Sequence, residues 1–484
     1  VSSGTWMPDA ATSTGPKTSQ IAYSYDIHGN VATMVQYSFA LDAKTVEYDY
    51  DLVSGKVNAL YYQRYKNDQF THRYIYDADN RLTEVRTSPD GIFWDKDAAY
   101  QYYKHGPLAR TELGDARVQG LDYAYTLHGW IKGVNSGSLR PNQDMGKDGT
   151  TLAQGFARDA FGYLLSYYSD DYKSIGTGAT NLNVPTTAPN LFNGNIRQMT
   201  TAIEPFMLST GQPLASDYAY DQLNRLLKAT YNQPSFDKTS NQWVSGAANK
   251  KWQNAFEYDA NGNILRQKRN GDKVAPTATA YDMDDLTYAY YPGTNQLQKI
   301  SDPVAPSNYT LAQDKIEDLE TQTAVNNYLY DPIGNLTNDV AEKLAIQWNL
   351  QGKVSKITDA APAQIIDFGY NPMGNRVLKT VNNLSTYHAL DASGNVLATY
   401  RRDAQGNVTL ESSWLYGSSR IGEYRAEKCV SGPCLPPIGN RTDHVYRTAG
   451  KRRYEESNHL GNVLATVSDR KVPVVAGSTV TGFA

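Results

Sequence analysis

Aromatic residues recur two positions apart along the chain, and each pair precedes a short polar segment. Examples are Tyr23/Tyr25, Tyr48/Tyr50, Tyr74/Tyr76, Tyr218/Tyr220, Phe256/Tyr258, Tyr328/Tyr330 and Phe368/Tyr370. Residues two apart on a strand share one face of a sheet. After the polar segment the apolar residues alternate again, as at Val396, Ala398 and Tyr400. The pattern predicts β-hairpins with one aromatic face.

The polar segment has a consensus: an aromatic residue, Asp or Asn, two variable residues, Gly or Asn, a polar residue and an aliphatic residue. An Asp or Asn side chain can bond the backbone ahead of it, and Gly or Asn accepts a positive φ angle. The segment is therefore predicted to be the hairpin turn. The residues expected to define the repeat are Tyr25, Asp26, Gly29, Tyr76, Asp77, Tyr220, Asp221, Tyr258, Asp259, Gly262, Tyr330, Asp331, Gly334, Tyr370 and Gly374.

The spacing of the motifs predicts how the hairpins assemble. The first copies begin at Tyr25, Tyr50 and Tyr76, which is the length of two strands and two turns. A single hairpin is marginally stable, so the units are expected to stack edge to edge into one long sheet. Such a sheet must close or be covered to protect its edges. The sequence predicts an all-β fold, with a short helical insertion at residues 310–325 as the best helix candidate.

Composition and charge exclude several classes of protein. The chain has 46 Lys and Arg against 50 Asp and Glu, a balance that argues against a nucleic-acid-binding protein. No apolar run approaches the roughly 20 residues that a transmembrane helix requires. Cys429 and Cys434 could form a disulfide in an oxidising compartment, or remain two free thiols.

The sequence contains no recognised catalytic or cofactor-binding motif. None of the seven histidines has a metal-ligand spacing, and the chain contains no GxSxG or GxxxxGK[ST] motif. Two groups of acids, Asp77 with Asp79 and Asp282 with Asp284 and Asp285, could offer oxygen ligands to Ca²⁺. Turn formation or solvation is the favoured interpretation of both groups. We therefore expect no catalytic, cofactor-binding or metal-binding residues, and no enzymatic activity.

The repeated motif resembles the YD repeat of bacterial Rhs proteins, which also occurs in teneurins and in the C component of insecticidal toxin complexes. Residues 122–133, 156–163 and 192–196 resemble blocks of one branch of the Rhs proteins, and residues 414–422 and 458–469 resemble the Rhs repeat-associated core. The resemblance implies YD-repeat hairpins wound into a large spiral sheet that forms a hollow shell. Residues 1–410 would be the β-shell with its insertions, and residues 411–484 a partial core.

The family pattern also implies a paired Asp-Pro-x-Gly self-cleavage signature and a variable toxin after the core. We expect the chain to stop before both of them. Asp331-Pro332-Ile333-Gly334 matches the signature but belongs to a repeat, so we interpret it as a turn. An autoprotease or toxin fragment is accordingly disfavoured.

The function implied is a non-enzymatic shell or scaffold segment of a secreted or cell-surface protein. It would encapsulate or present a cargo or toxin domain that is not in this chain. The alternative is a cell-surface adhesin or a glycan- or protein-binding module. A protein partner or downstream segment is expected to cover the open rim of the shell. The apolar stretch at Val472, Val474, Val475 and Val480 could pair with that partner by strand addition, or be a disordered end.

Overall fold

A computed structural model describes residues 19–483, apart from residues 40, 141–142, 151–154, 176–180, 205–206, 208–210, 238, 247–248, 272–281, 306–318, 320, 361–362, 435–447 and 477–478. In the described residues the regular structure is almost entirely β, so the predicted fold class is confirmed. Most of the helix candidate at 310–325 falls outside the described residues, and residues 321–325 are not helical. No described helix is long and apolar enough to cross a membrane.

The first half of the chain forms an 18-stranded antiparallel sheet. Its strands are β1 (Ser19–Tyr25), β2 (Val31–Ser38), β3 (Leu41–Tyr50), β4 (Val57–Tyr62), β5 (Phe70–Tyr76), β6 (Leu82–Ser88), β7 (Asp95–Tyr102), β8 (Leu108–Leu113), β9 (Gln119–Tyr125), β10 (Ile131–Val134), β11 (Phe161–Ser166), β12 (Gln198–Ile203), β13 (Leu214–Tyr220), β14 (Leu226–Asn232), β17 (Asn249–Tyr258), β18 (Ile264–Asn270), β19 (Asp282–Tyr290) and β20 (Leu297–Ser301). A small hairpin, β15 (Ser235–Asp237) and β16 (Gln242–Val244), branches from it.

The second half forms a 12-stranded sheet and a separate hairpin. The strands of the sheet are β21 (Tyr328–Tyr330), β22 (Leu336–Asp339), β23 (Leu344–Trp348), β24 (Val354–Ala360), β25 (Ala363–Tyr370), β26 (Arg376–Val381), β27 (Leu384–Leu390), β28 (Val396–Arg402), β29 (Val408–Tyr416), β30 (Arg420–Ser431), β31 (Arg452–Ser457) and β32 (Val463–Ser468). The strand β29 crosses the expected boundary between residues 410 and 411.

The last hairpin consists of β33 (Pro473–Ala476) and β34 (Thr479–Phe483), which pair with each other. Three of the four valines considered for strand addition, Val474, Val475 and Val480, thus lie in strands that pair within the chain. This hairpin also contacts the segment just before β11, because the amide of Arg158 donates to the carbonyl of Phe483 at 3.2 Å.

Each motif joins two antiparallel strands with the same register. The aromatic residue that opens the motif pairs with the aliphatic residue that closes it, as Tyr25 does with Val31 and Tyr258 with Ile264. A shift in register immediately precedes each of these aromatic residues. Such irregularities bend and twist a sheet. Their repetition supplies curvature at each hairpin.

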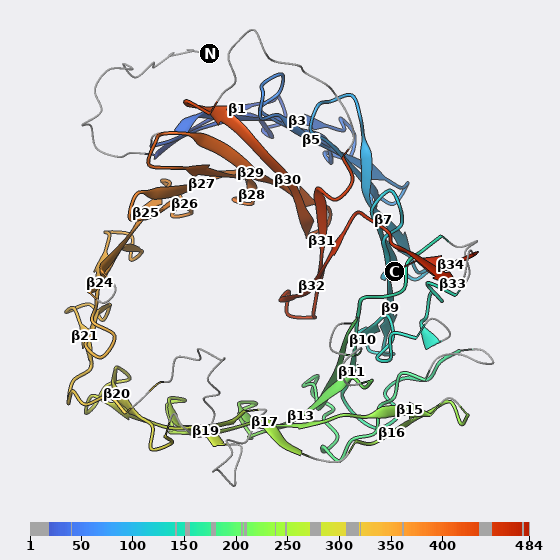
Figure 1. The fold of residues 1–484 in the computed structure, drawn as a ribbon, viewed down its shortest axis with the longest axis vertical. Helices are drawn as coiled ribbons and strands as arrows, with labels where there is room; N and C mark the ends of the chain where they lie inside the picture. The colour runs from blue at the N-terminus through green and yellow to red at the C-terminus, as the bar shows by residue number, and fades with distance from the viewer. Residues whose placement is uncertain are drawn as a thin grey trace.

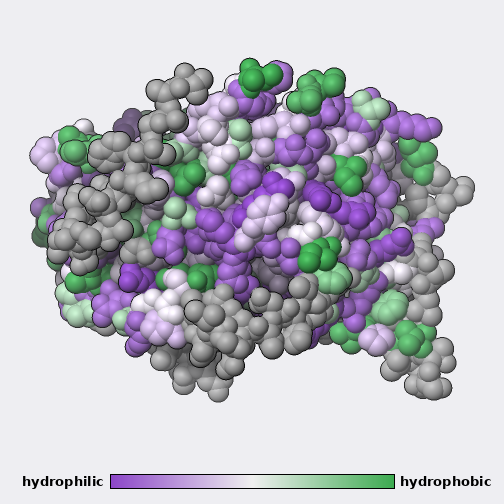
Figure 2. Space-filling model, turned by 90° about the horizontal axis from the view of Figure 1, so that it is seen from above, coloured by the Kyte–Doolittle hydropathy of each residue, from purple (hydrophilic) through white to green (hydrophobic). Residues whose placement is uncertain are grey.

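The strands wind around a common centre (Figure 1). The chain passes from β1 to β9, continues through β10 to β20, and returns through β21 to β27. The final strands β28–β32 then run inside the first ones. The largest hydrophobic core lies between these two windings and includes Tyr62, Val85, Tyr400 and Leu415. Figure 2 shows a largely hydrophilic face with separate hydrophobic patches.

Candidate functional site

The turn of each motif is built around its Asp side chain. In the motif that begins at Tyr258, Asp259 Oδ1 accepts from the amide of Asn263 at 2.8 Å, and Oδ2 accepts from Asn263 Nδ2 at 2.7 Å. Gly262 completes the turn with φ +93°. The hydrogen bond from the amide four residues ahead recurs at Asp26, Asp77, Asp221 and Asp331. These hydrogen bonds lower the pKa of Asp26 and Asp259, since they favour the charged carboxylate.

In most motifs the aromatic residue binds the preceding motif, a contact that the sequence did not reveal. The hydroxyl of Tyr258 donates to the carbonyl of Leu226, the aliphatic residue that closes the previous turn, at 2.8 Å. The same contact occurs, at 2.7–3.1 Å, from Tyr50 to Val31, Tyr76 to Val57, Tyr102 to Leu82, Tyr167 to Ile131, Tyr220 to Ile196, Tyr290 to Ile264, Tyr330 to Leu297, Trp348 to Leu336, Tyr370 to Val354 and Tyr416 to Val396. It explains the abundance of Tyr, because Phe cannot donate this bond.

The motif turns line up along one rim of the wound sheet formed by β1–β14 and β17–β32, which we call the wall. Consecutive strands alternate in direction, so each turn that follows a motif strand emerges at the same edge. Neighbouring turns are also bonded to each other: Arg225 donates to the carbonyl of Asp259 at 3.0 Å, and Asn263 donates to Asn295 at 2.9 Å. The variable turn positions expose apolar side chains along this rim, at Ile27, Leu52, Val53, Leu127, Leu223, Ile333, Leu350, Met373 and Leu460.

The two windings are joined by buried polar contacts. The hydroxyl of Tyr400 on β28 lies 2.6 Å from that of Tyr62 on β4 and donates to Asp68 at 2.6 Å. Asp68 also binds the ammonium of Lys44 at 2.6 Å. Burial raises the pKa of the Asp68 carboxyl, but the charge of Lys44 and the hydrogen bonds from Lys44 and Tyr400 together outweigh burial, so the pKa is lowered. The inner strand β28 therefore completes a buried polar group within the core, and the members of this group satisfy each other's hydrogen bonds.

A second group lies further along the same overlap. The guanidinium of Arg452 on β31 binds Asp97 at 2.8 Å and Asp95 at 2.7 Å, both on β7. Its third contact is to Thr87 on β6 at 3.1 Å, and the hydroxyl of Tyr454 donates to Asp97 at 3.1 Å. All these side chains are buried. The last large strands are therefore bonded to the first ones by directional contacts as well as by apolar packing.

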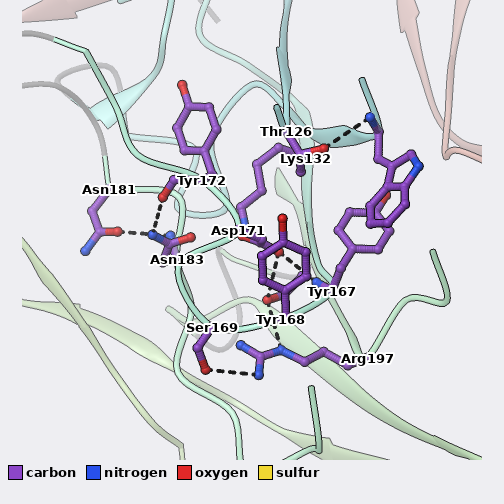
Figure 3. Close-up of polar contacts among 12 residues, drawn as sticks. Thr126, Lys132, Tyr167, Tyr168, Ser169, Asp171, Tyr172, Asn181, Asn183 and Arg197 are labelled. Carbon is purple, nitrogen blue, oxygen red and sulfur yellow. Dashed lines mark hydrogen bonds and ion pairs between the residues drawn. The ribbon is translucent and has the colours of Figure 1, made fainter. Parts of the chain in front are cut away.

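A third buried polar group holds the segment that follows β11 against the sheet (Figure 3). Lys132 on β10 binds Asp171 at 2.7 Å, and both side chains are fully buried. Desolvation lowers the pKa of Lys132. Asp171 also accepts from the amide of Tyr167 at 2.7 Å. The segment that follows β11 is thereby fixed to the sheet.

A cavity of about 950 Å³ lies between the windings. Glu456 and His459 line it together with Tyr123 and Tyr163. Glu456 is fully buried, and neither of its carboxylate oxygens has a hydrogen-bond partner among the described residues. Burial raises the pKa of Glu456 to about 8. The carboxyl of Glu456 is thus protonated over much of the neutral range.

The acids singled out in the sequence are paired with cations. Asp77 binds Arg81 at 2.7 Å, and the three acids near residue 284 bind Lys268, Arg269 and Arg266. Neither group forms a cluster of free ligands. A different set, Asp122, Asp144 and Asp148, comes together instead. The two cysteines, Cys429 and Cys434, form a disulfide.

No family model and no curated protein matches the sequence. Among solved structures, TcdB2-TccC3 without its hypervariable C-terminal region is similar, with a TM-score of 0.57 and 13% identity. The match covers 92% of this chain and 19% of that chain, so this chain spans about a fifth of its length. The Tc holotoxin pore of Photorhabdus luminescens also matches, with a TM-score of 0.46, 13% identity and coverage of 95% and 22%.

The first of these two similarities extends over nearly the whole of this chain, and it concerns the fold. It agrees with the repeated hairpins, the shared register of the motifs and the winding of the sheet. This chain has the β-shell fold of the Rhs and YD-repeat type that its motifs predicted.

Proposed function

We propose that this chain is a wall segment of a container that encloses or presents a cargo polypeptide, and that it catalyses no reaction itself. The observation that carries the proposal is the overlap of the windings. Arg452 and Tyr400 bond the last strands to the inside of the first ones. A spiral fastened in this way is a wall around an interior.

The repeat structure suits a wall. Each strand in the interior of a sheet bonds to both neighbours, so few strand edges are left for proteases or for pairing with other chains. The hydrogen bond from the aromatic residue of a motif to the previous motif further joins neighbouring hairpins. Such a wall keeps a polypeptide inside it away from proteases and from its targets until release.

A protein partner is part of the proposal. The rim with the motif turns carries a row of apolar side chains, and exposed apolar surfaces that follow one edge are typical of protein contacts. The similar solved structure contains two named components, TcdB2 and TccC3. The disulfide between Cys429 and Cys434 supports export, because disulfides persist in oxidising compartments.

Limited proteolysis of the native protein tests the proposal. We expect the enclosed cargo polypeptide to resist digestion while the wall is intact. It should be degraded once Arg452→Met loosens the overlap of the two windings. Arg401→Met is the matched control, because Arg401 pairs with Glu411 at 3.1 Å on the exposed surface. The control should leave protection unchanged.

Two results would contradict the container. One is digestion of all other polypeptide at the same rate whether or not the overlap is intact. The other is recovery of the wall as a monomer without any other polypeptide, together with binding to glycans or cells. The second result would support the adhesin instead.

A further inference from the structure

Four aspartates converge in the part of the chain that runs from β9 to the start of β11. Asp122 lies on β9, Asp144 and Asp148 follow β10, and Asp159 precedes β11. Asp144, Asp148 and Asp159 are more than nine-tenths buried, and the side chain of Asp122 is 12% exposed. One carboxylate oxygen from each of Asp122, Asp144 and Asp148 lies within 4.8 Å of the others. Asp122 and Asp159 are 37 positions apart in the sequence, so the set is assembled only by the fold.

The charge of this group is not balanced by the described side chains. Arg110 on β8 binds Asp122, and its second amino group binds Asp148 at 2.8 Å. Among the described residues this guanidinium binds two of the four carboxyl groups, and it also lies 3.7 Å from Glu112. Buried charges are costly unless they are paired, so a group of this sign requires further positive charge or bound protons.

Two of the carboxylates have oxygens without a partner. Oδ1 of Asp144 and Oδ1 of Asp159 are buried and accept no hydrogen bond from the described residues. The Asp159 carboxyl lies within hydrogen-bonding reach of the Asp144 side chain, and two carboxylates this close repel each other unless a proton or a cation lies between them. The orphaned oxygen of Asp159 is an observation independent of the three-residue cluster.

Glycines allow the acids to approach each other. A Cβ atom at Gly120 would collide with Asp148 Oδ2 and Arg110, and one at Gly146 would collide with Asp122 Oδ2 and Arg110. Any side chain at either position would displace the carboxylates. The local sequence is therefore compatible with a close set of oxygen ligands.

We propose that Asp122, Asp144, Asp148 and Asp159 form a binding site for Ca²⁺, in which Asp144 and Asp159 contribute the oxygens that lack other partners. Hard oxygen ligands suit Ca²⁺, whereas Zn²⁺ favours nitrogen and sulfur. Mg²⁺ retains several waters and prefers a strict octahedron, which a buried and closely packed group of carboxylates serves poorly. The ion would fasten the segment between β10 and β11 to the wall.

Calorimetric titration of the EDTA-treated chain with CaCl₂ tests the site, together with melting curves in EDTA, CaCl₂ and MgCl₂. We expect saturable Ca²⁺ binding and a higher melting temperature in CaCl₂ than in EDTA or MgCl₂. The double variant Asp144→Asn/Asp159→Asn should lose both effects. Asp79→Asn is the control, because Asp79 is exposed and lies beside Arg81; it should retain both.

The neutral double variant also reports on the apo state. Asn has the shape of Asp without its charge, so in EDTA the variant should melt at or above the temperature of the wild type. A lower melting temperature in EDTA would show that the carboxyls stabilise the fold without a cation, and would overturn the proposal. Absence of saturable Ca²⁺ binding, its retention in the double variant, or equal stabilisation by MgCl₂ would overturn it as well.

Discussion

Arg452 and Asp97 are 355 residues apart in the sequence, yet the guanidinium Nε of one lies 2.8 Å from a carboxylate oxygen of the other. Both side chains are buried between the inner and outer windings. Neither residue belongs to a repeat motif. Their contact fastens the spiral at its overlap, which is the feature on which the container proposal rests.

Removing this contact should loosen the overlap. Arg452→Ala leaves Asp95 and Asp97 buried without their cation, and breaking a buried pair in this way costs roughly 3–5 kcal/mol. Urea denaturation checks the value. Arg401→Ala, which removes an exposed pair, should cost at most about 1 kcal/mol. Equal losses for the two variants would show that the overlap pair is not special.

The hydroxyl of Tyr258 should stabilise the wall through Leu226. Tyr258→Phe removes one partly buried hydrogen bond and keeps the ring, so we expect a loss of about 1 kcal/mol in unfolding free energy. Tyr25→Phe is the matched control. Tyr25 is exposed and belongs to the first described motif, so no earlier described turn lies within its reach. A loss as large at Tyr25 would contradict the proposed role of the contact.

The left-handed turn position should tolerate Asn better than Val. Gly262 has φ +93°, and Asn80 and Asn224 occupy the equivalent positions of other motifs at φ +59° and +62°. Gly262→Val should destabilise the hairpin by roughly 1–3 kcal/mol because a β-branched residue is strained there. Gly262→Asn should cost clearly less. Thermal melting of the two variants compares them, and equal melting temperatures would argue against a strained turn.

Glu456 should make stability depend on pH. Burial raises its pKa from 4.5 to about 8, so between these values the folded chain holds a proton that the unfolded chain releases. The contribution to unfolding free energy therefore falls as the pH rises through this window, by up to about 1.4 kcal/mol per pH unit. Denaturation of wild type and Glu456→Gln at pH 5 to 8 isolates the effect.

The difference between these two proteins should grow in favour of Glu456→Gln as the pH rises. Glu411→Gln is the control, since Glu411 lies on the exposed surface. Its difference from the wild type should change much less over the same range. A constant difference for Glu456→Gln would show that the carboxyl titrates normally.

The hairpins and their turns could be predicted because their physics is local. Asp259, Gly262 and Asn263 lie within five residues, so the side-chain bond and the positive φ angle can be inferred from the order of residues alone. The alternation around each turn likewise defines which side chains share a face. The ring of each Tyr could thus be placed on a face of the sheet, but the acceptor of its hydroxyl could not be identified. It lies in the previous motif at a distance that varies with each insertion.

The sequence alone determined the repeating unit, which is a strand with aromatic residues, a turn built around Asp and a second strand. Because single hairpins are marginally stable, the many copies of this unit must pair into a long sheet. What only the tertiary structure decided is where distant copies meet. The contacts of Arg452 with Asp97 and of Tyr400 with Asp68, and the group formed by Asp122, Asp144, Asp148 and Asp159, depend on the accumulated curvature of many hairpins. The bend at one register shift is too small to be inferred from a single motif. The bends of many motifs add up, and together they set which winding lies inside the other.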